Sequence, residues 1–315
     1  MGIHHVTAIA GDPQRNLDFY AGVLGMRLVK LTVNFDDPST YHLYYGDELG
    51  HPGSILTFFP WPEGLPGRQG TGQVGTVSLA VPPASLGFWI ERLLAHGIRY
   101  EGPVRRFDEQ VLSLKDPDGL LLELVATSRV SETPPWTEGP VTGEHAVRGL
   151  HATIWEDGDS GTADLLTRVL GFQPIGEEGN VLRLQSADVG QGTVVDLRRA
   201  PGFWRGGGGV GTVHHIAFRA KDDAEQLVKR AEIEGQGTGI TPVIDRHYFH
   251  SVYFREPGGV LFEIATDPPG FTIDEPVAEL GTHLKLPPMY ERSREDIERV
   301  LPPLRLPHAP AGEAR

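Results

Sequence analysis

The chain has 315 residues, of which 39% are hydrophobic and 22% are charged, so it is long enough for two domains with buried cores and has an ordinary globular composition. Its formal net charge of -14 disfavours nucleic acid and anionic membrane surfaces as partners. We find no 18-residue apolar stretch and no signal peptide, which predicts a cytoplasmic protein. Because cysteine is absent, any metal ion has to be bound by histidine and carboxylate side chains.

The chain contains an internal repeat, which can be followed from the N-terminus. Residues 3–29 predict a strand, an amphipathic helix and then VLGM, and residues 150–175 repeat this order with VLGF. Residues 75–98 predict another strand and helix, and a similar pattern begins at residue 211. DPDGLLLELVA at 116–126 also matches EPGGVLFEIAT at 256–266. We therefore expect four βαβββ modules that begin near residues 3, 75, 149 and 211.

Composition divides these modules along the chain. Modules one and two predict an N-terminal domain over residues 1–126, and modules three and four predict a C-terminal domain over residues 148–275. The segment 127–147 between them is rich in proline and glycine and has no sustained periodicity, as expected of a linker. Residues 276–315 have no counterpart in the repeats and predict a C-terminal extension with a helix around residues 290–300.

A histidine pair occurs twice, as His4-His5 in the first module and as His214-His215 in the fourth. Each pair lies in a predicted strand, and Glu263 lies in the last strand of the fourth module. Two imidazoles and one carboxylate on separate strands are the ligand set of the facial triad, which binds non-haem Fe(II) and leaves positions open for substrate and oxygen. By strand alternation, only one histidine of each pair is expected to reach an ion.

Alignment of the four modules gives two sets of equivalent positions. The first strands share a position that contains His5, Leu79, Ala152 and His215. The last strands share a position that contains Thr57, Glu123, Asp196 and Glu263.

This pattern of modules resembles the vicinal oxygen chelate superfamily of glyoxalases, bleomycin resistance proteins and extradiol dioxygenases. The resemblance implies an α+β fold of two cup-shaped half-barrels, each built from two modules. A cup of modules one and four contains His5, His215 and Glu263, whereas pairing in chain order leaves one imidazole in each cup. We therefore expect modules one and four to share the metal cup. The other cup is expected to lack histidine, with Glu123 and Asp196 as structural acids.

Three longer stretches resemble the hydroquinone ring-cleaving dioxygenases of the 2,6-dichlorohydroquinone 1,2-dioxygenase type, and the resemblance spans nearly the whole chain. The stretches are GIHHVTAI, LVKLTVNFDDPSTYHLYYGDELGHPGSILTFFP and DRHYFHSVYFREPGGVLFEIATDPPGF. The resemblance implies an Fe(II)-dependent dioxygenase, with Mn(II) as the alternative ion, that inserts O2 into a hydroquinone-type aromatic ring. It makes His5, His215 and Glu263 the metal ligands. The residues that it implies around the ligands and the substrate are His4, Thr7, His214, Arg246 and Tyr253.

The reaction suggests a role for each of these residues. A bound phenol has to lose a proton, and partly reduced oxygen needs hydrogen-bond donors. We expect His214 or His4 to be the acid/base and Tyr253 to donate to substrate or oxygen. Thr7 and Arg246 are expected to bind substrate, and the positive charge of Arg246 would stabilise a phenolate or a product carboxylate. A surface ion pair is the alternative for Arg246.

Other functions share the same triad. An extradiol catechol dioxygenase would use the same ligands. A glyoxalase-type isomerase or lyase usually has two carboxylates around its ion, and Thr57 stands where the second would be. A non-catalytic protein that binds an aromatic ligand is the third alternative. The expected partners are a small aromatic molecule and O2, and a homo-oligomer is left open.

Overall fold

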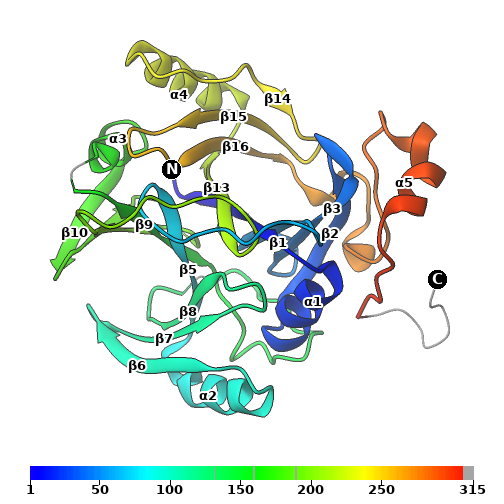
Figure 1. The fold of residues 1–315 in the computed structure, drawn as a ribbon, viewed down its shortest axis with the longest axis horizontal. Coiled ribbons are helices and arrows are strands. Elements are labelled where there is room, and N and C mark those ends of the chain that lie inside the picture. The colour runs from blue at the N-terminus through cyan, green and yellow to red at the C-terminus, as the bar shows by residue number, and fades with distance from the viewer. Residues whose placement is uncertain (131, 159, 189, 308–315) are drawn as a thin grey trace.

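The computed structural model describes residues 1–130, 132–158, 160–188 and 190–307 of the chain, so the end of the predicted extension 276–315 lies outside the described residues. Two curved sheets of eight strands each form the body of the molecule, and short helices lie at its periphery (Figure 1). This is the α+β architecture of paired half-barrels that the module pattern predicts.

The first sheet is built from modules one and four. Its strands are β1 (Ile3–Ala10), β2 (Arg27–Asn34), β3 (Asp37–Gly46), β4 (Ile55–Pro60), β13 (Thr212–Ala220), β14 (Ile244–Asp245), β15 (Phe249–Arg255) and β16 (Leu261–Pro269). They lie in the order β14-β15-β16-β13-β1-β4-β3-β2, with β1 and β13 antiparallel at the centre. The prediction that the first and last modules share one cup is confirmed.

The second sheet is built from modules two and three. Its strands are β5 (Gln73–Val81), β6 (Tyr100–Arg106), β7 (Glu109–Lys115), β8 (Leu121–Ala126), β9 (Leu150–Glu156), β10 (Phe172–Glu178), β11 (Val181–Ser186) and β12 (Val194–Arg199). Their order is β10-β11-β12-β9-β5-β8-β7-β6. Each sheet thus combines one module from each half of the chain. The division into an N-terminal domain over residues 1–126 and a C-terminal domain over residues 148–275 stays a prediction.

A helical segment follows the first strand of every module. The segments are α1 (Pro13–Leu17) with η1 (Asp18–Val23), η2 (Pro83–Ser85) with α2 (Leu86–Ala95), α3 (Thr162–Arg168) and α4 (Asp223–Gly235). Asp12 and Asp222 are the N-cap residues of α1 and α4, because their carboxylates accept hydrogen bonds from backbone N–H groups three residues later. The helix α2 buries Trp89 and Leu93, which shows how these amphipathic segments complete the core.

The C-terminal extension packs against module one, beside β2 and β3 (Figure 1). η3 (Phe271–Ile273) leads from β16 into the extension, which contains η4 (Val277–Glu279), η5 (Glu291–Ser293) and α5 (Arg294–Val300). The helix α5 agrees with the one predicted around residues 290–300. The buried Lys30 of β2 binds Asp274 at 2.6 Å and also binds Glu275. These two acids directly precede the extension, so the buried ion pairs anchor its start to the first sheet.

Two β-bulges interrupt the central strand pair of the first sheet. Across this pair His5 lies opposite Ala217 and Thr7 lies opposite His215, while His4 and His214 have no residue opposite them. His4 and His214 are therefore the extra residues of the two bulges, and such residues change the direction in which neighbouring side chains point.

Candidate metal centre

The central strands bring His5, His215 and Glu263 together inside the half-barrel of the first sheet, which we call the first cup. The Nε2 atoms of His5 and His215 are 3.2 Å apart. Glu263 Oε2 lies 3.4 Å from the first and 2.9 Å from the second of these nitrogens. All three side chains are buried, and in the described part of the chain they form the group of histidine and acidic residues whose ligand atoms converge.

This geometry fits one divalent ion. Three ligand atoms at bonds of about 2.1 Å and right angles to one another lie about 3.0 Å apart, close to the observed separations. Glu263 Oε1 accepts a hydrogen bond from Ser251 Oγ at 2.5 Å. Its Oε2 is buried without a hydrogen-bond donor of suitable geometry among the described residues. Such an oxygen is costly unless a cation compensates it, so the donor set is suited to a metal.

The protonation states of Glu263 and His215 are those of metal ligands. Burial favours the neutral acid, but His5 and His215 outweigh it and hold the pKa of Glu263 well below its usual range. Burial lowers the pKa of His215, although the nearby Glu263 opposes this shift. A charged carboxylate beside a neutral imidazole is ready to bind a cation without first losing a proton.

His4 and His214 contact the two ligand imidazoles from the side remote from the triad. The Nδ1 atoms of His4 and His5 are 2.9 Å apart, and those of His214 and His215 are 2.8 Å apart. Because the Nε2 atoms of His5 and His215 face the triad, their Nδ1–H groups donate to the neighbouring histidines, and this fixes the ligand tautomers. Burial and His5 hold the pKa of His4 well below its usual range, so its ring is neutral and can accept.

The expectation that the two histidines of each pair face opposite sides of the strand is wrong. Strand alternation applies to a regular ladder, and the extra residue of a bulge breaks it. Each bulge turns the first histidine of its pair toward the second, which converts a repeated dipeptide into a ligand and its hydrogen-bond partner.

Tyr253 and Arg246 form a polar pair next to His215. The rings of Tyr253 and His215 have centroids 5.8 Å apart, and burial and Glu263 raise the pKa of Tyr253, so it remains a hydrogen-bond donor. Arg246 Nε donates to the Tyr253 hydroxyl at 3.2 Å. The two terminal nitrogens of Arg246 each lie 3.0 Å from an oxygen of Asp36. The alternative of an ion pair is thus confirmed for Arg246, and the pair connects module four to the β2–β3 loop of module one.

A chain of hydrogen bonds lies on the module-one side of the cup. Thr57 Oγ1 is 2.8 Å from Thr7 Oγ1 and 2.8 Å from His42 Nε2, and all three residues are buried. The His42 ring packs against the rings of Tyr44 and Phe59, with centroids 3.9 Å and 4.3 Å away.

From the sequence we expected His42 either at the surface or beside the metal ligands, and the structure places it inside the first cup. We did not expect Ser251 at this site. Strand alternation gives a signal that could have identified it, because Ser251 lies two residues before the predicted site residue Tyr253 and their side chains lie on the same face of the sheet.

The half-barrel of the second sheet, which we call the second cup, contains a network of ion pairs. Arg183 donates to both carboxylate oxygens of Asp196 at 2.8 Å and to Glu109 at 2.6 Å. Arg106 donates to the two oxygens of Glu123 at 2.9 Å and 2.7 Å. Arg183 and Arg106 therefore pair with Asp196 and Glu123, in agreement with the structural role expected for these two acids.

The expectation that the second cup lacks histidine is wrong. In the first cup Glu263 lies opposite Ala217, and Ala217 is two residues after the ligand His215. In the second cup Asp196 is the equivalent of Glu263, and it lies opposite Thr153. The residue two before Thr153 is His151, which therefore occupies the ligand position that we expected Ala152 to hold. The cause is the bulge: β13 contains an extra residue before its ligand, whereas in the equivalent pairing of β5 with β9 the extra residue, Gly75, lies in β5 and not in β9. Burial lowers the pKa of His151 to about 4.

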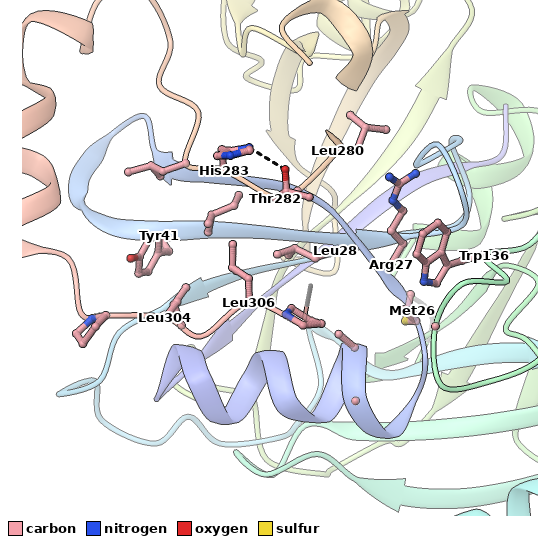
Figure 2. Close-up of a pocket in the computed structure, with 18 of the residues that line it drawn as sticks. Met26, Arg27, Leu28, Tyr41, Trp136, Leu280, Thr282, His283, Leu304 and Leu306 are labelled. Atoms are coloured by element: carbon pink, nitrogen blue, oxygen red, sulfur yellow. Dashed lines mark hydrogen bonds between the residues drawn. The ribbon is translucent and has the colours of Figure 1, made fainter. Parts of the chain in front are cut away.

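A cavity of about 1260 Å³ lies between module one and the C-terminal extension (Figure 2). Leu28 and Tyr41 line it from the first sheet, and Leu304 and Leu306 line it from the extension. Arg27 and Trp136 lie at one end, with the guanidinium carbon 4.4 Å from the ring centroid. None of the lining residues belongs to the triad, so this space is separate from the metal centre.

A family model described as the Glyoxalase/Bleomycin resistance protein/Dioxygenase superfamily matches residues 2–124 and 150–264. Together with the two cups and the buried triad, this match shows that the chain belongs to that superfamily. No described helix is long and apolar enough to cross a membrane.

The chain is also similar to individual members of the superfamily. It is 51% identical over 305 residues to "Putative ring-cleaving dioxygenase MhqO" of Bacillus subtilis strain 168, with 96% of both chains covered. It is 34% identical over 309 residues to "Chlorohydroquinone/hydroquinone 1,2-dioxygenase" of Sphingobium indicum, with 95% of both covered.

Solved structures agree with this placement. A crystal structure titled as a putative dioxygenase from Bacillus subtilis has a TM-score of 0.93 and 49% identity, and the match covers 98% of this chain and 99% of that one. Glyoxalase I of Zea mays shares the fold, with a TM-score of 0.62 at 17% identity over 84% of this chain and 92% of that one.

Proposed function

We propose that this protein is a ring-cleaving dioxygenase that inserts O2 into a hydroquinone-type aromatic ring, with Fe(II), or alternatively Mn(II), bound by His5, His215 and Glu263. The observation that carries the proposal is the buried triad, in which the Nδ1 atoms of the two histidines are hydrogen-bonded to His4 and His214. The names of relatives at 34% and 51% identity support the reaction class. The cytoplasmic location and a possible homo-oligomeric assembly belong to the same proposal.

The bound ion would supply the redox chemistry that brings substrate and O2 together. His214 is the acid/base that we favour over His4, because it is exposed whereas His4 is buried behind His5. Burial of part of its ring and the nearby His215 lower the pKa of His214 to about 4, so the ring is neutral at pH 7. Its acceptor nitrogen is Nδ1, so His214 would take a phenol proton only when the ring turns and releases the hydrogen bond from His215.

Tyr253 and Arg246 would bind the oxygen substituents of the ring. Tyr253 stays protonated and donates a hydrogen bond, and Arg246 supplies a positive charge whose position Asp36 fixes. Thr7 would act at the same site through its contact with Thr57. A glyoxalase-type reaction is disfavoured because Thr57 stands where a second carboxylate would be.

The test is anaerobic reconstitution with Fe(II) followed by oxygen uptake on substituted hydroquinones and on catechols. We expect one iron per chain and faster uptake with hydroquinones. Faster uptake with catechols would identify an extradiol enzyme instead, and bound iron without uptake on either class would contradict the proposal.

A matched pair of variants tests the location of the site. His5→Ala should abolish both iron retention and oxygen uptake, because it removes a ligand. His151→Ala changes the equivalent residue of the second cup and should leave iron retention as in the wild type. If His151→Ala loses iron while His5→Ala retains it, the metal site lies in the second cup and the proposed location is wrong.

A further inference from the structure

Two residues other than glycine have a positive φ angle in the described part of the chain, Phe107 at 54° and His247 at 65°. A side chain in this left-handed region is strained, and such strain persists only where the surrounding structure enforces it. Both residues lie in hairpin loops at the same place in their modules, Phe107 between β6 and β7 and His247 between β14 and β15. Each directly follows an arginine, Arg106 or Arg246. The strained conformation therefore recurs together with the arginine before it.

The hairpin loop of module four is a γ-turn around His247. The N–H of Tyr248 donates to the carbonyl of Arg246 at 2.7 Å, and the N–H of Arg246 donates to the carbonyl of Phe249 at 2.9 Å. A hydrogen bond across two residues, with a positive φ at the residue between them, marks the rare and strained form of this turn. The N–H of His247 also donates to Asp245 Oδ1 at 2.7 Å, which ties the turn to β14.

Tyr248 anchors the other side of the turn. Its side chain is fully buried, and its hydroxyl donates to Asp274 at 3.0 Å. Asp274 Oδ2 also lies 3.5 Å from His247 Nε2, and Asp274 Oδ1 lies 2.6 Å from Lys30 Nζ. Because Tyr248 is fixed in the core, the chain has to reverse its direction directly after Arg246, and this enforces the strained backbone at His247.

The arginine before each strained residue points into its cup. In module two Arg106 donates to both oxygens of Glu123, at 2.9 Å and 2.7 Å. In module four Arg246 donates instead to the Tyr253 hydroxyl at 3.2 Å. Tyr253 lies opposite Glu263 in the strand pairing. The same turn thus directs one guanidinium to a carboxylate of the second cup and the other to a hydroxyl beside the triad of the first cup.

We infer that His247 is a positioning residue, whose strained turn directs the guanidinium of Arg246 into the first cup, where it binds an oxygen of the substrate. This inference rests on the proposed function. A free arginine side chain has many conformations, and ordering it only when substrate binds would weaken binding. Asp36 and Tyr253 fix the end of the side chain, and the turn fixes its start.

Two substitutions that both remove the imidazole ring separate the role of the backbone from that of the ring. His247→Gly accepts the positive φ, whereas His247→Val opposes it because valine is β-branched. We expect kcat/KM for oxygen uptake on hydroquinone to fall about tenfold in His247→Val, since a hydrogen bond from a charged group is lost. The value for His247→Gly should stay within about threefold of the wild type, because its backbone keeps the turn. Mn(II) affinity, measured by electron paramagnetic resonance, should be unchanged in both, because the triad is intact.

Two controls separate positioning from a general loss of stability. In an Arg246→Gln background, His247→Val should have no further effect on kcat/KM, because the residue acts only through Arg246. Phe107→Val opposes the equivalent turn of the second cup, and it should lower the urea midpoint but leave kcat/KM as in the wild type. Equal kcat/KM values for His247→Gly and His247→Val, or an equal loss in Phe107→Val, would overturn the inference.

Crystal structures of the metal-free variants test the positioning without any activity. Arg246 Nε should stay within hydrogen-bond distance of the Tyr253 hydroxyl in His247→Gly and leave it in His247→Val, and retention in both would overturn the inference. If His247→Val does not fold, His247→Ala takes its place, since a Cβ atom also opposes the positive φ, and its kcat/KM should be about threefold below that of His247→Gly. A wild type inactive on every hydroquinone would instead refute the proposed function, and the crystal structures would still decide whether His247 positions Arg246.

Discussion

His4 and His214 each extend the metal centre by one hydrogen bond, and this makes the repeated histidine pair a functional unit. In each pair the second histidine is positioned as a ligand and the first accepts from its Nδ1–H group. Ligands held in this way need little rearrangement when a metal binds.

His4→Phe tests this arrangement. The substitution keeps an aromatic ring but removes the acceptor for His5, and we expect Mn(II) affinity to fall by about 10- to 100-fold, as is usual when a hydrogen-bond partner of a metal ligand is lost. His4→Gln provides an amide oxygen as a replacement acceptor and should recover most of the affinity. Equal Mn(II) affinities for His4→Phe and the wild type would show that His5 does not need His4 as an acceptor to bind the ion.

At the scale of strands, the sequence was sufficient to predict the modules, their pairing and the last-strand positions, because apolar periodicity and repeated turns encode them. It did not predict the bulges, since pairing register depends on contacts between β1 and β13, which are some 210 residues apart in the chain. The error at His151 has the same origin. The sequence alignment assumed that the first strands of all modules have equal lengths, whereas β1 and β13 each contain one residue more before the ligand than β9 has before His151.

The second cup shows how the equivalent strands are stabilised where the described residues contain no metal triad. Arg183 is buried between Asp196 of β12 in module three and Glu109 of β7 in module two. Arg183→Leu would leave the buried Asp196 without its charged partner and Glu109 with only its 3.4 Å contact to Arg129, and we expect the free energy of unfolding to fall by about 3–5 kcal/mol. Urea unfolding followed by circular dichroism measures this loss.

An exposed ion pair provides the control for Arg183. Arg168 lies 3.6 Å from Asp164 on α3, and both side chains are largely exposed. Arg168→Leu should therefore change the unfolding free energy by less than about 1 kcal/mol. If the two variants lose equal stability, the buried network does not have the structural role that we assign to it.

At the scale of the whole molecule, the triad forms where the first and last modules meet. The proposed metal ligands are residues 5, 215 and 263, so the site requires nearly the whole chain to be folded. The extension that follows β16 then packs back onto module one. Tyr290 donates a hydrogen bond to the backbone of Phe35, the neighbour of Asp36, which binds Arg246 at the cup. The extension thereby supports the loop that positions a proposed substrate-binding residue.

Lys30→Met tests this support, because Lys30 is the buried cation that binds the start of the extension. Without it, the fully buried Glu275 loses its charged partner, and we expect about 3–5 kcal/mol less stability in urea unfolding. Limited proteolysis should also cut the extension faster. Lys229→Met, which removes a partly exposed pair with Glu232 on α4, is the control and should alter neither property. An unchanged unfolding midpoint for Lys30→Met would mean that apolar packing, rather than this ion pair, holds the extension against the first sheet.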